Sequence, residues 1–250
     1  MNKPATIFKD YSSHRPYFLA FVRTLEISHF LRSSPLKGNV LDFGCGDGFF
    51  LQMLAKYYPQ LFKNSKIIGL DLSKYKNKIY HSTVSYDGKV LPFKTKSIDN
   101  IISNCVFEHV PNLELSVNEL YRILKPNGIM VCTVMSNYWN DYCRLPNWFW
   151  DKAQVHHNLY TQEKWQQTFE KAGFKVKIVK GYLNKRQSQF VEIGHFLSLP
   201  YLVSKLIFNK WHYFNFLYKP LQHSKKVEEL LNEKVDSKNP AGLYFELRKK

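Results

Sequence analysis

Three alternating glycines, Gly44, Gly46 and Gly48, directly follow a short apolar run in the sequence. Glycine lets the backbone turn sharply and lie close against a ligand, and the helix that follows such a turn offers a partial positive charge at its start. Two acids stand at the ends of apolar runs: Asp42 just before the turn, and Asp71 at the end of the next run. Together these residues predict a cradle for a nucleoside ligand.

The turn differs from the two common phosphate-binding turns. The dinucleotide fingerprint GxGxxG has a small residue five positions after its first glycine, and here that position is Phe49. A phosphate-binding P-loop ends in Gly-Lys-Ser or Gly-Lys-Thr, and this turn does not. The turn therefore favours a nucleoside without a pyrophosphate over NAD or ATP.

Short apolar runs alternate with amphipathic stretches along the chain, and these elements would position the turn and the acids. The predicted strands are 39–43, 66–70, 80–85, 98–105, 129–135, 174–179 and 243–247. Apolar residues at i, i+3 and i+4 predict helices at 49–58, 113–124 and 162–172. This alternation favours a mostly parallel sheet with helices on both faces.

Five short motifs follow one another along the chain. They are Val40–Gly48, Ile68–Ser73, Asp87 with Leu91–Phe93, Ser97–Ser103 with Glu108–Val110, and Leu124–Gly128. In this order they resemble the motifs of class I S-adenosylmethionine-dependent methyltransferases of the small-molecule type, over about residues 39–180. The resemblance implies an α/β fold, a Rossmann-like three-layer sandwich with a mostly parallel seven-stranded sheet. It also implies S-adenosyl-L-methionine as the cofactor.

The resemblance implies a role for each matching residue. Asp42 would bind the amino group of the methionine moiety, Asp71 the two ribose hydroxyls, and Asp87 the adenine amine; a carboxylate offers two acceptor oxygens to a pair of hydroxyls. The other residues that it places against the cofactor are Gly44, Cys45, Gly46, Leu72, Gly88, Asn104, Cys105 and Tyr11. An ordinary role as a turn residue or strand-end cap remains the alternative for each acid.

Methyl transfer from a sulfonium is an in-line displacement, so a base is needed only where the acceptor must lose a proton. Three histidines are candidates for this catalytic role: His109 after the fourth predicted strand, and His156 and His157 in an aromatic segment before the helix at 162–172. The ordinary pKa of histidine, about 6.5, suits a base at neutral pH. A structural or cofactor-lining role is the alternative for each.

The composition is that of a folded chain with a basic surface. Of 250 residues, 44% are hydrophobic, and 36 Lys+Arg against 20 Asp+Glu give a formal net charge of +16. This composition excludes a disordered or low-complexity protein, and the charge favours an anionic partner or simply a basic surface. The four cysteines lack metal-ligand spacing, so no metal site is predicted. We find no signal-peptide core and no apolar run of spanning length, and therefore expect a cytoplasmic protein.

Two segments interrupt the alternation of strands and helices: 137–160, which is rich in aromatic rings, and 184–240. We expect an N-terminal helical cover (1–38), a Rossmann-like core that binds the cofactor (39–183), an aromatic and basic insertion (184–240) and the last strand of the core sheet (241–250). Within the insertion, 190–221 mixes aromatic rings with lysines. This pattern is typical of a segment that lies on an anionic membrane, but Pro200 and the lack of a clean polar face favour a helical lid over the substrate.

Several signatures of other methyl acceptors are missing. Asn104-Cys105-Val106-Phe107 is not the Asn/Asp-Pro-Pro-aromatic element of enzymes that methylate base amines, and no RNA-binding module is recognisable. These absences favour a small organic acceptor methylated at oxygen, such as a saccharide, lipid-linked or isoprenoid-type compound. As partners we expect this acceptor and the surface of an anionic membrane, and no nucleic acid. An RNA methyltransferase and a non-catalytic S-adenosylmethionine-binding partner protein remain the alternatives.

Overall fold

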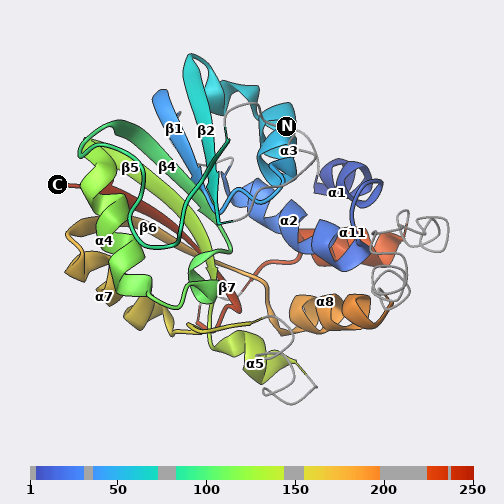
Figure 1. Ribbon diagram of the computed structural model, residues 1–250. Coiled ribbons are helices and arrows are strands. Elements are labelled where there is room, and N and C mark those ends of the chain that lie inside the picture. The colour runs from blue at the N-terminus through green and yellow to red at the C-terminus, as the bar shows by residue number, and fades with distance from the viewer. Residues whose placement is uncertain (1–3, 31–35, 73–82, 144–154, 198–223, 236–237) are drawn as a thin grey trace.

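Figure 1 shows the computed structural model, which describes residues 4–30, 36–72, 83–143, 155–197, 224–235 and 238–250. Seven strands form one sheet in the order β3-β2-β1-β4-β5-β7-β6. They are β1 (Gly38–Phe43), β2 (Ser65–Asp71), β3 (Thr83–Ser85), β4 (Ile98–Asn104), β5 (Leu124–Met135), β6 (Phe174–Tyr182) and β7 (Gly242–Lys249). Only β7 runs antiparallel to its neighbours. The predicted mostly parallel, seven-stranded sheet is confirmed.

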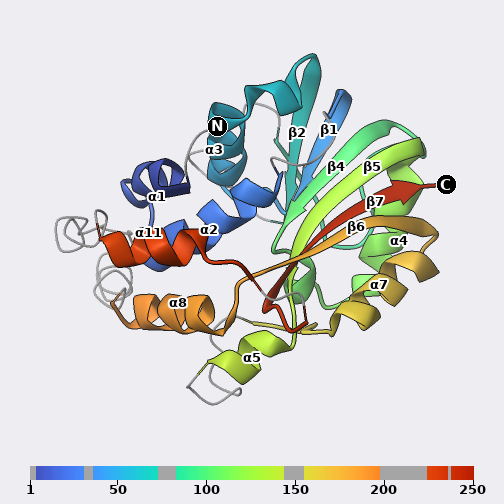
Figure 2. The ribbon, with the colours of Figure 1, turned by 180° about the vertical axis from the view of Figure 1, so that it is seen from behind.

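Alternate side chains of each strand enter two separate apolar cores, because successive residues of a strand point to opposite faces. In β1, Val40 belongs to one core and Leu41 to the other; in β5, Val131 and Met130 divide in the same way. The helices that bury apolar residues in the first core include α1 (Pro4–Ser12), α2 (Tyr17–Phe30) and α3 (Phe49–Tyr57). Two helices on the opposite face belong to the second core: α4 (Leu113–Ile123) and α7 (Gln162–Lys171) (Figure 2). The fold is therefore a three-layer α/β sandwich.

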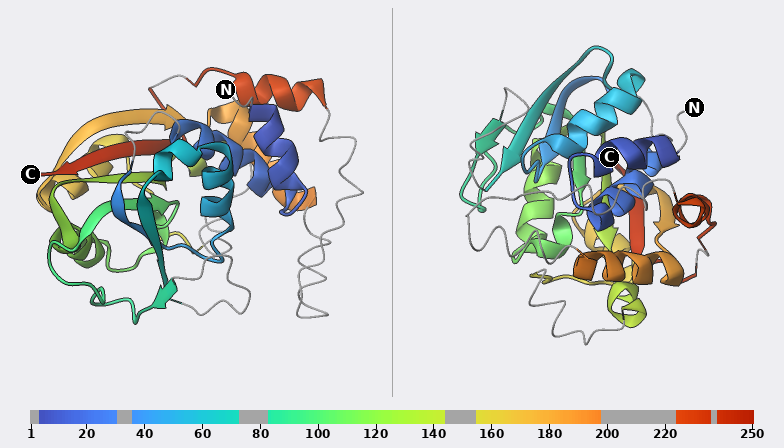
Figure 3. Two further views of the ribbon diagram at one scale, coloured as in Figure 1. Left: turned by 90° about the horizontal axis from the view of Figure 1, so that it is seen from above. Right: turned by 90° about the vertical axis from the view of Figure 1, so that its right-hand side faces the viewer.

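Two helices that the sequence did not predict, α8 (Lys185–Leu197) and α11 (Lys225–Asn232), join α1 and α2 beside the sheet (Figure 3). Helix α11 buries Val227, Leu230 and Leu231, which are spaced i, i+3 and i+4 and so lie on one helical face. Helix α8 packs mainly on α2 and also contacts α5 (Tyr138–Tyr142). Segments far apart in the sequence thus meet in one helical group.

The helices that the sequence did predict have local boundary signals. Helix α3 ends just before Pro59, and α7 begins after Thr161, whose side chain accepts a hydrogen bond from the N–H of Lys164 at 3.3 Å. Strand β5 begins at Leu124, five residues before the predicted start, so that prediction was too short. Residues 80–82 of the third predicted strand lie outside the described residues.

The aromatic and basic stretch 190–221 is described only up to residue 197, where it forms the end of α8; the rest lies outside the described residues. The same holds for most of the tryptophan-rich part of 137–160. Among the helices that the structure describes, none has both the length and the apolar character needed to cross a membrane.

Candidate functional site

The glycine turn lies where β1 and β2 end. The carbonyl oxygen of Leu70 accepts hydrogen bonds from the N–H groups of Gly44 and Cys45, at 2.8 and 3.1 Å. Gly44 has a φ of 74°, and a Cβ at this position would overlap the side chain of Val106, so only glycine fits. Gly46 has a φ of 54°, and no atom lies within 4 Å of the position that its Cβ would take. The turn is therefore packed on the side of β4 and open on the other side.

The two strand-end acids lie together beside this open side. A carboxylate oxygen of Asp71 accepts a hydrogen bond from the N–H of Gly46 at 2.8 Å. Asp42 is 4% exposed, and burial, followed by the charge of Asp71, raises its pKa to about 7. Both influences disfavour the ionised form of Asp42. A cationic group bound beside Asp42 would favour the ionised carboxylate and so would lower this pKa. The pair is thus suited to a ligand with a positive charge.

Three further residues of the predicted cofactor site follow the ends of β2 and β3. Leu72 is 63% exposed, and its side chain lies 3.2 Å from the position that a Cβ of Gly88 would take. Asp87 accepts a hydrogen bond from the N–H of Lys89 at 3.0 Å, as a turn residue does. Leu72 and Gly88 therefore lie next to each other, and the Leu72 side chain is open to solvent.

The N-terminal segment closes over the start of α3. Tyr11 is buried, and its ring packs edge-on against the ring of Phe49, with centroids 4.9 Å apart. Arg15 forms an ion pair with Asp47 of the glycine turn, and its guanidinium lies 4.4 Å from the centroid of the Phe49 ring. Tyr11 is thus adjacent to the turn, as the sequence suggested.

Asn104 and Cys105, at the end of β4, take part in a buried polar network that the sequence did not predict. Its centre is Glu26 of α2, which is fully buried. The carboxylate of Glu26 accepts four hydrogen bonds: from Arg23 at 2.6 Å, Asn104 at 2.9 Å, Cys105 at 3.0 Å and Tyr182 at 3.1 Å. The side chains of Asn104 and Cys105 therefore hold α2 over the carboxyl end of β4.

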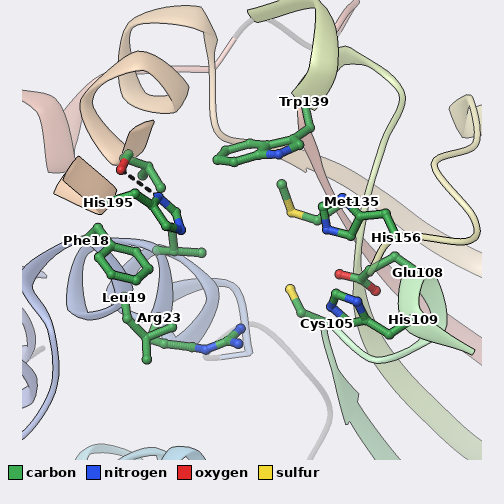
Figure 4. Close-up of a pocket in the computed structure, with 12 residues that line it drawn as sticks. Phe18, Leu19, Arg23, Cys105, Glu108, His109, Met135, Trp139, His156 and His195 are labelled. Carbon is green, nitrogen blue, oxygen red and sulfur yellow. Dashed lines mark hydrogen bonds between the residues drawn. The ribbon is translucent and has the colours of Figure 1, made fainter. Parts of the chain in front are cut away.

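A cavity of about 300 Å³ adjoins this network (Figure 4). Its walls come from α2, α5 and α8, from the 3-10 turn η2 (Phe107–His109), and from residues at the ends of β4 and β5. Rings line much of it: Phe18, His109, Trp139, His156 and His195. Phe18 and His195 lie on one side and His109 and His156 on the other, as Figure 4 shows. The size is at the lower end of the range for small-molecule sites.

The comparison with known families decides which kind of site this is. A family profile described as "Methyltransferase domain" matches residues 11–177, more than half of the chain. The chain belongs to the methyltransferase family. Its resemblance to S-adenosylmethionine-dependent methyltransferases is thereby confirmed, and S-adenosyl-L-methionine is its cofactor.

Relatives of this methyltransferase match only parts of it. The malonyl-[acyl-carrier protein] O-methyltransferase of Legionella pneumophila is 31% identical over 122 residues, 45% of this chain and 41% of that protein. The chain spans about two fifths of the length of the curated malonyl-[acyl-carrier protein] O-methyltransferases that it matches.

Solved structures share the fold over nearly the whole chain. One is a chain in the complex between the Haloferax volcanii Trm112 methyltransferase activator and a methyltransferase (TM-score 0.59, 16% identity, 96% of both chains covered). Another is phosphoethanolamine N-methyltransferase 2 of Haemonchus contortus in complex with S-adenosylmethionine (TM-score 0.56, 15% identity, 97% of this chain and 60% of that one). At these identities, the likeness shows the fold alone.

The residues at the turn of this methyltransferase fit the cofactor by charge and by shape. S-adenosylmethionine carries an ammonium and a sulfonium, and the pair formed by buried Asp42 and half-buried Asp71 brings two carboxyl groups together. The open side of Gly46 leaves room for a ligand against the backbone. Asp42 would hold the cationic end, and Asp71 would hold the ribose if it keeps one oxygen on Gly46 and offers the other.

Two of the three predicted histidines of the methyltransferase line the cavity, and the third does not. The rings of His109 and His156 are stacked, with centroids 5.1 Å apart. His157 is exposed and is not among the lining residues; its backbone N–H donates to the carbonyl oxygen of Glu108 at 2.8 Å. The structure therefore gives His109 and His156, but not His157, access to a molecule in the cavity.

Sequence analysis did not single out several residues of the cavity wall. Glu108 was noted only as part of a motif, and Arg23 and His195 were not noted at all. Burial lowers the pKa of His195 to about 4, so this histidine is neutral at physiological pH. The sequence feature that could have indicated the buried glutamates is a charged residue in an apolar setting. Glu26 lies in an apolar helix, and Glu108 follows an apolar strand directly after Val106-Phe107.

Proposed function

We propose that this methyltransferase transfers the methyl group of S-adenosylmethionine to a small organic acceptor, at an oxygen atom of that acceptor. The observation that carries the proposal is the position of the cavity. Cys105 lines it, the next residue, Val106, packs against Gly44 of the glycine turn, and the turn fits the cofactor. An acceptor in the cavity would therefore lie beside the cofactor site.

Oxygen is supported by the groups that line the cavity. A hydroxyl must lose its proton when it is methylated, and two imidazoles and a carboxylate line the wall formed by His109, His156 and Glu108. The Legionella relative is named an O-methyltransferase, which agrees with transfer to oxygen, but the malonyl group in that name offers a carboxylate and not a hydroxyl. Saccharide, lipid-linked and isoprenoid-type acceptors are all compatible with the ring-lined wall.

The division of work follows from the chemistry of methyl transfer. The cofactor supplies a methyl group on a sulfonium, whose leaving group is already activated. The chain then has three tasks: Asp42 and Asp71 hold the cofactor, the ring-lined wall orients the acceptor, and a group of the cavity takes the acceptor's proton. Helices α2 and α8 contribute part of that wall.

The direct test is calorimetry of the purified chain with S-adenosylmethionine and S-adenosylhomocysteine. Both carry the ammonium that Asp42 would bind, so binding should convert Asp42 to its ionised form. At pH 6.5 we therefore expect binding to release protons, seen as a heat that varies with the ionisation heat of the buffer. Absence of binding to both compounds would contradict the proposal.

The acceptor and the two alternatives are tested together. Extracts of cells with and without the protein are compared by mass spectrometry, and we expect a small molecule that gains one CH₂ unit. Labelled methyl groups that enter RNA would favour an RNA methyltransferase, and RNA binding would then weaken with salt. Binding of the cofactor with no methylated product would favour a non-catalytic partner protein.

We also propose peripheral contact with anionic membranes through residues 190–221. The support is the sequence alone, in which aromatic rings alternate with Lys205, Lys210 and Lys219. Flotation with liposomes that contain an anionic lipid should carry the full chain and not a variant that lacks this stretch. Equal flotation of both would favour a lid.

A further inference from the structure

The cavity contains one fully buried carboxylate that the described part of the chain leaves without a hydrogen bond. Glu108 is 0% exposed, and neither of its carboxylate oxygens accepts a hydrogen bond from the described residues. Buried polar groups are almost always paired, and an unpaired one costs free energy. Because Glu108 lines the cavity, a bound molecule is the natural donor for these oxygens.

Two protein donors lie near the Glu108 carboxylate, its own backbone N–H and the thiol of Cys105, and neither has hydrogen-bond geometry to it. The thiol of Cys105 lies close to Glu108, but it donates to Glu26 at 3.0 Å, and burial raises the pKa of this thiol well above its ordinary value. A thiol has a single proton. The guanidinium of Arg23 is likewise engaged with Glu26, at 2.6 Å. The network around Glu26 thus takes the donors that Glu108 would otherwise share.

We propose that Glu108 binds the acceptor of the methyl transfer, by accepting the proton of a hydroxyl group on a flat ring, and that the cavity disfavours acceptors that present a carboxylate. This inference rests on the proposed function and adds to it the class of acceptor.

The ring is indicated by the shape and the lining of the cavity. Phe18 and His195 are stacked on one side, with centroids 3.7 Å apart, and His109 and His156 are stacked on the opposite side. Trp139 lies between the two pairs along a third side (Figure 4). A flat ring can pack against such walls, and a volume of about 300 Å³ suits one ring with short substituents.

The charge state of the bound group is indicated by the ionisable neighbours. The ionisable groups near Glu108 are Arg23 and Glu26 of α2, Cys105 after β4, Cys132 of β5, Tyr182 of β6, and His109, His156 and His195, which line the same cavity. Two of these neighbours matter most: Glu26 adds a second negative charge, and Arg23 is paired with it. A carboxylate would meet repulsion from Glu108, and an ammonium would lie near Arg23. A neutral hydroxyl avoids both.

The same oxygen can take the proton during the reaction. Burial raises the pKa of Glu108 to about 7, so near neutral pH it is ionised in part and can accept a proton. The hydroxyl proton passes to a Glu108 oxygen. The acceptor oxygen forms the bond to the methyl carbon while the carbon–sulfur bond breaks, with both electrons left on sulfur. The proton leaves Glu108 when the product departs.

The test measures binding rather than turnover. Three probes of similar size are titrated by ligand-observed NMR into the ligand-free chain and into the chain with S-adenosylhomocysteine: 4-ethylphenol, benzoate and benzylamine. We expect 4-ethylphenol to bind at least tenfold more tightly than benzoate. Its affinity should rise between pH 6 and 8, because the ionised carboxylate is the better acceptor and a phenol stays neutral below its own pKa of about 10.

Glu108→Gln keeps the shape of the side chain and cannot take the proton. We expect it to weaken 4-ethylphenol binding about tenfold, to remove the pH dependence, and to strengthen benzoate binding. Glu170→Gln, at an exposed position on α7, is the matched control and should bind all probes as the wild type does.

Three outcomes would overturn the inference. If benzoate binds most tightly, Arg23 is the anchor, and if benzylamine binds most tightly, the acceptor is an amine. The third outcome is that 4-ethylphenol does not bind the wild type, or binds Glu108→Gln as tightly as the wild type. The proposed function is judged separately by the binding of S-adenosylhomocysteine. If this compound does not bind while the phenol preference holds, the proposed function fails and the assignment of Glu108 to the cavity stands.

Discussion

Two fully buried glutamates near the same cavity, Glu26 and Glu108, have opposite surroundings. Glu26 accepts four hydrogen bonds from protein side chains, whereas Glu108 accepts none from the described residues. Burial alone therefore does not distinguish a structural carboxylate from one that binds a ligand; the supply of donors does. Glu26 fastens α2 to the sheet, and Glu108 is left to bind the acceptor.

The sharpest way to break this comparison is to remove the satisfied carboxylate. Glu26→Ala removes the partner of the Arg23 guanidinium in a buried setting. It also removes the acceptor of the hydrogen bonds from Asn104, Cys105 and Tyr182. We expect the free energy of unfolding to fall by about 3–5 kcal/mol, measured by denaturant titration. Glu163→Ala, on the exposed surface of α7, is the control and should change it by less than about 0.5 kcal/mol. A small loss in Glu26→Ala would mean that the network does not stabilise the fold.

Asp71, beside the glycine turn, is a third kind of carboxylate, because the protein supplies only part of the hydrogen bonds that it can accept. Asp71 holds one N–H of the glycine turn, and its remaining capacity is proposed to serve the ribose. Asp71→Ala should lower the affinity for S-adenosylhomocysteine about 100-fold, because charge-assisted hydrogen bonds and the support of the turn are lost together. Calorimetry measures this, with Asp141→Ala, on the exposed side of α5, as the control. Affinity equal to that of the wild type would refute the role of Asp71.

Removing the unsatisfied carboxylate should have the opposite sign from removing Glu26. The pKa of Glu108 is about 7 in the folded chain and about 4.3 in an unfolded one, so the folded state holds the proton more tightly. The contribution of Glu108 to the free energy of unfolding is therefore complete below pH 4 and is lost as the pH rises to about 7. Glu108→Gln has no such loss.

We accordingly expect Glu108→Gln to match the wild type near pH 4.5 and to be more stable by about 1–3 kcal/mol at pH 8, in the absence of ligands. Thermal unfolding at the two pH values measures the difference. Asp42, whose pKa is also raised to about 7, contributes the same slope to both proteins and cancels. A variant less stable than the wild type at pH 8 would show that Glu108 has a stabilising partner.

The arrangement of the glycine turn and the two strand-end acids could be predicted from the sequence, because its signals are local. A glycine turn after an apolar run and acids at strand ends are set by a few neighbouring residues, and the structure brings Asp42, Gly46 and Asp71 together. The seven-stranded sheet followed from the same alternation of strands and helices.

The cavity proposed for the acceptor could not be predicted, because its walls come from segments far apart in the chain. Phe18, Glu108, Trp139 and His195 meet only through packing of α2, η2, α5 and α8, and the last three of these elements were not expected. The burial of Glu108 depends on this packing, which no short pattern records. His156 and His157 are adjacent in the sequence, and no sequence pattern separates them; only the fold places His156 in the cavity wall and His157 outside it.

A second comparison concerns two ion pairs made by arginines of the N-terminal segment, Arg23–Glu26 and Arg15–Asp47, and it predicts the smallest change in stability. Arg23 and Glu26 are 20% and 0% exposed, while Arg15 and Asp47 are 20% and 39% exposed. Water and ions screen the more exposed pair, so Arg15→Ala should lower the free energy of unfolding by less than about 1 kcal/mol. Denaturant titration at low and high salt measures this, and the difference between variant and wild type should shrink as salt rises.

Arg15 nevertheless joins the N-terminal cover to the glycine turn, so its loss should be more visible in binding than in stability. The guanidinium pairs with Asp47 and packs on the ring of Phe49, and both contacts hold the cover over the start of α3. We expect Arg15→Ala to weaken S-adenosylhomocysteine binding a few-fold. Lys56→Ala is the control, because it removes the ion pair between Lys56 of α3 and Asp10 of α1, and it should leave this binding unchanged. Equal effects of the two variants would show that the cover acts through its general charge, and that the contact of Arg15 with the turn has no specific part in binding.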